Sequence, residues 1–118
     1  MIIAERVLKL RGGQGDVEIP VLIFAPQRTE DDWSCQIEIG WPGEKLTRIA
    51  VGVDAVQALE LALKMIGAQI YASDHHESGA LEWLKPEKGY GFPCPMAFAI
   101  CLLATTRNTC SYRRPSFL

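Results

Sequence analysis

The chain has 118 residues, 48% of them hydrophobic and 22% charged, with a formal net charge of -2. It is long enough for a single domain with its own core, and too apolar to be disordered. A slightly negative chain has no electrostatic drive toward nucleic acid, so we expect no nucleic-acid partner. The longest apolar run, residues 96–104, is too short to span a bilayer, and residues 1–6 lack the pattern of a signal peptide. We therefore expect a cytoplasmic protein with no membrane partner.

Residues 2–11 and 16–24 predict the first two strands. The glycine-rich segment 12–15 between them predicts a hairpin turn, because a phosphate loop would have to open onto a helix and here another strand follows. Pro20 cannot donate a ladder hydrogen bond, so its N–H side is expected to face a sheet edge or a bulge. Apolar side chains alternate along the second run at Val17, Ile19, Val21 and Ile23.

Residues 32–40 and 45–53 predict the third and fourth strands, after a polar loop at 25–31 and joined by a turn at 41–44. Short connections favour an antiparallel meander. One face of the third strand carries Trp33, Cys35, Ile37 and Ile39. One face of the fourth aligns Thr47, Ile49, Val51 and Val53.

Residues 54–72 predict a long helix, with Asp54 as N-cap and Gln57 completing a capping-box pattern. Glu60 and Lys64 have the spacing of an i,i+4 ion pair. An apolar stripe runs through Val56, Leu59, Leu63, Ile66 and Ile70. Further apolar residues widen it, so the polar side is narrow and we expect a second surface of the helix to be covered as well.

A polar loop at 73–79, a fifth strand at 80–84 and an irregular segment at 85–93 follow the helix. His75 and His76 lie in the loop beside acidic residues. Adjacent histidines diverge in either a strand or a helix, so they do not resemble the i,i+4 pair of metallohydrolases. We interpret them as part of a solvated loop, with a pH-sensitive or ligand-contacting histidine as the alternative.

The four cysteines, Cys35, Cys94, Cys101 and Cys110, form no CxxC pair, and we interpret them as reduced thiols. Cys35 shares a strand face with apolar residues, which predicts a raised pKa and a packing role in place of nucleophilic catalysis. The sequence thus predicts no catalytic residue, no metal and no cofactor. The candidate interaction surface comprises Trp41, His75, His76, Tyr90 and Phe92. The alternative is that the aromatic residues close the ends of the core.

Residues 3–8, 33–42, 52–59 and 89–93 together resemble a family of short bacterial proteins known only as a domain of unknown function. The resemblance covers about residues 2–93. It implies a small cytosolic α+β domain and no activity or site. The strand-rich half followed by an Asp-capped helix is also similar in architecture to immunity-type proteins that neutralise toxins.

Residues 94–118 depart from the family, whose members tend to continue with a polar tail containing an Arg-Asp-Leu-Leu-like element. Codons permitted for residues 94–107, read in another frame, can encode such an element. We therefore interpret residues 94–118 as an atypical, frameshifted tail of the single domain 1–118. The competing hypothesis is a genuine C-terminal helix or strand at 96–104 docked on the sheet.

These patterns predict a two-layer α+β fold, in which an antiparallel sheet of about four to five strands carries the 54–72 helix on one face. The leading functional hypothesis is a non-enzymatic protein-interaction module, of immunity type among others. The first alternative is a small-molecule binding domain or enzyme with a pocket near His75 or His76. The second is a homodimeric structural protein, so the expected partner is another protein or a second copy of the chain.

Overall fold

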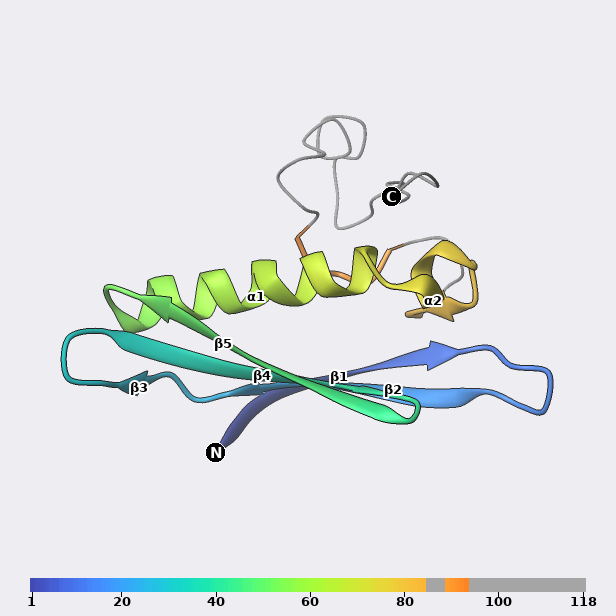
Figure 1. Ribbon diagram of the computed structural model, residues 1–118, viewed down its shortest axis with the longest axis horizontal. Helices are drawn as coiled ribbons and strands as arrows, with labels where there is room; N and C mark the ends of the chain where they lie inside the picture. Colours follow the sequence, from blue (N-terminus) through green and yellow to red (C-terminus); the bar gives the residue numbers. More distant parts are fainter. Residues whose placement is uncertain (85–88, 94–118) are drawn as a thin grey trace.

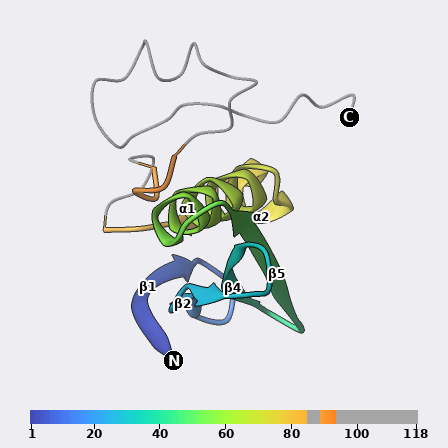
Figure 2. The same cartoon turned by 90° about the vertical axis from the view of Figure 1, so that its left-hand side faces the viewer.

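The computed structural model describes residues 1–84 and 89–93. One long helix lies along one face of a single antiparallel sheet, which gives two layers (Figures 1 and 2). The strands are β1 Ile2–Leu10, β2 Val17–Phe24, β3 Gln27–Arg28, β4 Trp33–Trp41, β5 Glu44–Gly52 and β6 Leu81–Glu82. The helices are α1 Ala55–Tyr71 and α2 Asp74–Glu77. The predicted fold class is confirmed.

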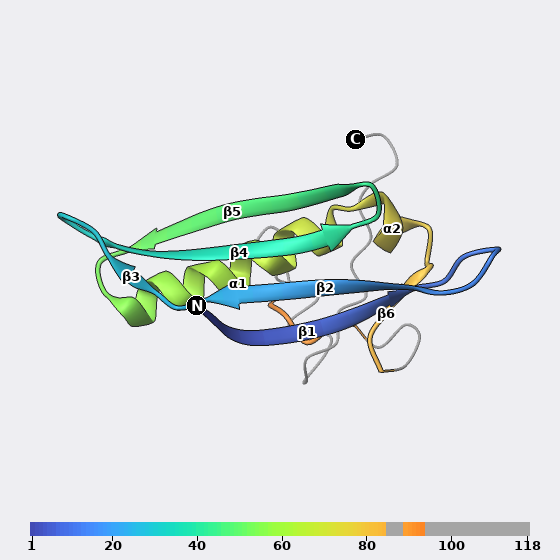
Figure 3. The ribbon, with the colours of Figure 1, turned by 90° about the horizontal axis from the view of Figure 1, so that it is seen from below.

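Strands β1, β2, β4 and β5 lie side by side in that order, each antiparallel to the next (Figure 3). This is the predicted meander, and the glycine-rich turn does connect a β1–β2 hairpin. β6 returns to the free edge of β1 and pairs only with Lys9 and Leu10, so it is shorter than the predicted fifth strand. The predicted loop at 25–31 contains β3, because β2 pairs with β4 only over Ile37–Ile39 and β3 fills the rest of that edge.

The expectation for Pro20 is a sheet edge or a bulge. The structure places Pro20 in an interior strand, at a position where β4 does not pair with β2. The β2–β4 pairing includes Val21 and Ile23 and does not extend to Pro20. Beyond the end of that pairing, the proline ring lies against Gly40, where an added Cβ would be 2.9 Å from the proline Cγ. The ladder therefore ends where the missing N–H would otherwise be needed.

The core lies between the inner face of the sheet and α1. The alternation predicted for the second and third strands is confirmed over residues 19–23 and 35–39, where every second residue is buried, whereas Val17 is exposed and Trp33 is partly buried. The buried residues of β2 and β4 are Ile19, Val21, Ile23, Cys35, Ile37 and Ile39. The buried residues of α1 are Ala58, Ala62, Ile66, Gly67, Ile70 and Tyr71.

The aligned apolar residues of β5 face away from the helix. Ile49 is 57% exposed and Val51 is 54% exposed. The register pairs Ala50 with Cys35 and Gly52 with Trp33, and directly opposed residues share a face, so these small residues point inward. The inner position needs them to be small, since a Cβ at Gly52 would lie 2.5 Å from the Ala58 nitrogen of α1.

Helix α1 begins as predicted. The Asp54 side chain accepts a hydrogen bond from the Gln57 backbone N–H at 2.7 Å, and Gln57 Oε1 accepts one from the Val53 N–H at 2.7 Å. The predicted Glu60–Lys64 ion pair is present at 3.1 Å. The stripe differs at its start, where Val56 is 73% exposed, because the face with the small residue Ala58 lies on the sheet instead.

Candidate functional site

The segment after α1 is partly helical. The sequence predicts a loop at 73–79, but α2 forms one turn there, with Ser73 as its N-cap. The Ser73 hydroxyl accepts a hydrogen bond from the His76 N–H at 3.2 Å. Ser73 therefore caps the single helical turn that Asp74–Glu77 form.

The helical turn sends the two histidines to different neighbours, since consecutive helical residues point about 100° apart. The His75 ring stacks on Trp41, with 5.0 Å between ring centroids and 26° between planes. His76 lies edge-on to Tyr71 at 4.9 Å, and its Nδ1 is 2.6 Å from the Tyr90 hydroxyl oxygen. We call these five residues the aromatic cluster. It contains four of the five residues of the candidate interaction surface.

Tyr90 and Phe92 are only 4% and 6% exposed. The Tyr90 hydroxyl also donates to the Leu81 carbonyl at 3.4 Å. These two side chains therefore close one end of the core. This is the alternative to an exposed interaction surface that the sequence left open for the aromatic residues. Trp41, His75 and His76 are partly exposed, so they are the part of the candidate surface that a partner can reach.

Burial raises the pKa of the Tyr90 phenol far above its ordinary value, and the neighbouring Tyr71 adds to the rise. The unfolded chain loses this proton at a pH of about 10. Stability is therefore expected to be independent of this group below pH ~10 and to fall above it, because the unfolded state then holds fewer protons than the folded one. Urea unfolding of the protein and of Tyr90→Phe across this range tests the expectation, which fails if both curves fall equally.

Arg6 is the charged residue that sequence reasoning missed. Its guanidinium carbon lies 4.0 Å from the Trp83 ring centroid and 4.8 Å from that of Phe92, so the group sits between two rings. Its Nη1 donates to the Tyr90 carbonyl at 3.0 Å. The signal was present in the strand pattern, since Arg6 shares a face of β1 with the buried Leu8.

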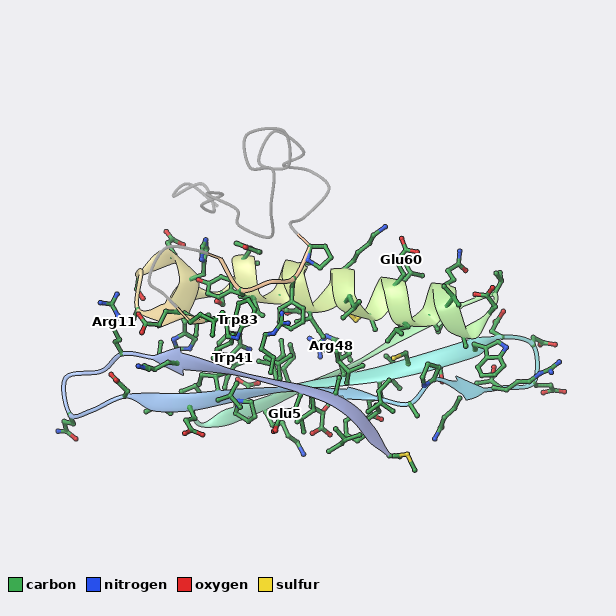
Figure 4. The ribbon with its side chains drawn as sticks, turned by 180° about the vertical axis from the view of Figure 1, so that it is seen from behind. Glu5, Arg11, Trp41, Arg48, Glu60 and Trp83 are labelled. Atoms are coloured by element: carbon green, nitrogen blue, oxygen red, sulfur yellow. The ribbon has the colours of Figure 1, made fainter. Side chains whose placement is uncertain are left out.

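A pocket of about 290 Å³ opens beside Arg6. It lies between β1, α1 and the segment 89–93. Its lining residues are Ala4, Glu5, Arg6, Ile23, Leu63, Gly91, Phe92 and Pro93. Figure 4 shows Trp83 between the helix and the sheet, whereas Glu5 points away below the sheet. Because three consecutive residues of β1 line the pocket, its wall includes the edge of that strand.

Cys35 is fully buried, and its Sγ donates to the Phe24 carbonyl at 3.3 Å. Burial raises the pKa of the thiol, as expected. Within the described ranges 1–84 and 89–93, no group of histidine, cysteine, aspartate or glutamate side chains has the arrangement of a metal site. In those same ranges no helix is long and apolar enough to cross a membrane. Cys94, Cys101, Cys110 and the hypotheses on residues 94–118 lie outside the described residues.

The order of the strands and the single covering helix define a small two-layer α+β domain. The family model for a domain of unknown function, DUF6968, matches residues 4–94, and the chain belongs to this family. The match ends within one residue of the end of the sequence resemblance. No curated protein and no solved structure matches the chain.

Proposed function

We propose that the chain is a non-enzymatic protein-interaction module whose binding surface is the outer face of the sheet. The observation that carries this proposal is the one-sided covering of the sheet. Helix α1 packs on the inner face, and none of the described elements lies on the outer face (Figure 3). The outer surface combines exposed apolar side chains with charged ones, and a protein interface likewise has an apolar core and a polar rim.

The apolar part of this outer face comes from three of the four meander strands, β1, β2 and β5. Val7, Ile49 and Val51 are each at least 42% exposed. Leu22 and Phe24 are partly exposed between them. The charged part includes Glu38, which lies 3.8 Å from Lys45 in an ion pair. On this face, which no described element covers, the apolar residues of β1 and β2 are separated from those of β5 by the polar outer side of β4. Five accessible apolar residues around a polar strip favour a docking role over simple solvation.

The two alternatives have weaker support. A pocket around His75 or His76 would need rings that are free to contact a ligand, and both rings pack on aromatic neighbours. A homodimer would use the same outer face or the edge of β5, so the size of the complex distinguishes it from a different partner. A toxin-neutralising role is one form that the leading proposal can take.

Ile49→Glu tests the proposal, with Val56→Glu as its matched control. Both replace an exposed apolar residue, but Val56 lies on α1, away from the outer face. After circular dichroism shows that both variants fold, each is used to capture partners from a host lysate. We expect wild type and Val56→Glu to retain one stoichiometric protein and Ile49→Glu to lose it, by at least about tenfold in affinity. Equal retention by all three proteins would contradict the proposal.

Light scattering on the purified proteins completes the test. A wild-type mass twice that of the monomer, lost in Ile49→Glu, identifies the partner as a second copy of the chain. A monomer that captures nothing under any condition would also sink the proposal.

A further inference from the structure

The guanidinium of Arg6 is held by rings and a backbone carbonyl of the described residues. Trp83 and Phe92 flank it, and the Tyr90 carbonyl accepts one of its N–H groups. An arginine has five N–H donors, and among the described residues one carbonyl accepts from Arg6, so that part of the chain leaves further donors for a ligand. Among the described residues no aspartate or glutamate oxygen forms an ion pair with Arg6, although Lys9 and Arg11 on the same edge both have such partners.

The chain is built to hold the group in this place. Gly91 has a φ of +78°, and an added Cβ there would contact Arg6 Nη1 and lie 2.7 Å from Trp83 Cζ3. Only a glycine therefore allows the 89–93 segment to close over the guanidinium. Burial lowers the pKa of Arg6, but an arginine remains charged at neutral pH. The result is a pre-positioned, partly buried cation.

The space beside this cation is apolar and small. Ala4, Ile23, Leu63 and Phe92 contribute to its walls, and its volume is about 290 Å³. One water molecule, which has a single non-hydrogen atom, occupies about 30 Å³ in the liquid, so this space accommodates roughly ten non-hydrogen atoms. A ligand that fits must therefore combine one anionic group with a short apolar body.

We propose that this pocket, the Arg6 pocket, binds a small organic monocarboxylate. The carboxylate accepts hydrogen bonds from the Arg6 guanidinium, whose planar donors match its two oxygens. The aliphatic or aromatic body of the ligand occupies the space between β1 and Leu63 of α1. A monoanion fits better than a phosphate dianion, because Arg6 is the one cation among the described lining residues and most of the others are apolar. The acidic lining residue, Glu5, points away below the sheet (Figure 4). The site is separate from the outer face, so its failure leaves the proposed interaction role intact.

The test is a nitrogen-15 NMR titration of the full chain with 3-phenylpropionate and with hexanoate. The corresponding neutral amides serve as matched ligands. We expect the acids to shift the amides of β1 and of Gly91 and Phe92 with a dissociation constant on the order of 1 mM, which is typical of ligands of this size. The amides are expected to bind at least ten times more weakly. Equal shifts from acids and amides, or no shift from either, would overturn the proposal.

Two variants separate the role of the charge from that of the pocket. Arg6→Gln removes the cation, and Arg48→Gln is its matched control on β5, at the opposite edge of the sheet. Ala4→Leu narrows the pocket at an exposed position and leaves Arg6 in place, so it remains informative if Arg6→Gln fails to fold. We expect Ala4→Leu and a folded Arg6→Gln to lose at least nine-tenths of the affinity, and Arg48→Gln to keep it. Unchanged binding in Ala4→Leu places the ligand elsewhere and overturns the proposal.

Discussion

Replacing Ile37 by alanine is expected to lower the free energy of unfolding by about 2–5 kcal/mol. Ile37 is fully buried on the inner face of β4, beneath α1. Truncation removes apolar contacts and leaves a cavity that the surrounding strands can fill only in part. Urea unfolding followed by tryptophan fluorescence measures the loss. For a domain of this size, such a loss approaches half of the total stability.

Ile49→Ala provides the comparison, because the same side chain is shortened on the opposite face of the sheet. Ile49 is 57% exposed, so its truncation is expected to cost less than about 1 kcal/mol. A similar loss in both variants would mean that the outer face is covered in the isolated protein. That result would contradict the two-layer arrangement, as well as the availability of the outer face for a partner.

The alternation of apolar residues predicts which side chains share a face, but it does not predict which face meets the helix. For β4 the more apolar face is also the face that meets the helix, since Cys35 and Ile37 are buried as expected. For β5 the more apolar face, with Ile49 and Val51, points outward. The pairing with β4 and the close approach of α1 at Gly52 decide the matter, and both are tertiary effects that a single strand pattern does not contain.

The candidate site was predictable in part for a similar reason. The sequence places Trp41, His75, His76 and Tyr90 in one candidate interaction surface. In the structure His75 stacks on Trp41 and His76 contacts Tyr90, which are two separate ring contacts. The Arg6 pocket was not predicted, because it forms only when residues 89–93 return to the edge of β1. Such contacts join residues more than eighty positions apart, as in the hydrogen bond from Arg6 to the Tyr90 carbonyl. A local sequence pattern does not predict them.

Gly67→Ala is expected to destabilise the protein by about 1–3 kcal/mol and to weaken carboxylate binding by the Arg6 pocket. Gly67 is buried in α1, and an added Cβ would lie against the Pro93 carbonyl oxygen and 3.0 Å from its carbonyl carbon. The 89–93 segment cannot yield by a side-chain rotation, because the contact is with its backbone. It must move away from the helix, and Phe92 and Pro93 then leave the pocket wall.

The sign of this effect makes the prediction decisive. In an isolated helix, alanine is more favourable than glycine by about 1 kcal/mol, so Gly67→Ala would stabilise α1 if nothing lay on it. Gln69→Ala, a change to the same residue two positions away, is expected to stay within about 0.5 kcal/mol of wild type. Urea unfolding of the three proteins measures both effects. A gain in stability for Gly67→Ala would show that the 89–93 segment does not cover the helix, and that the second covered surface implied by the narrow polar side of α1 must have another origin.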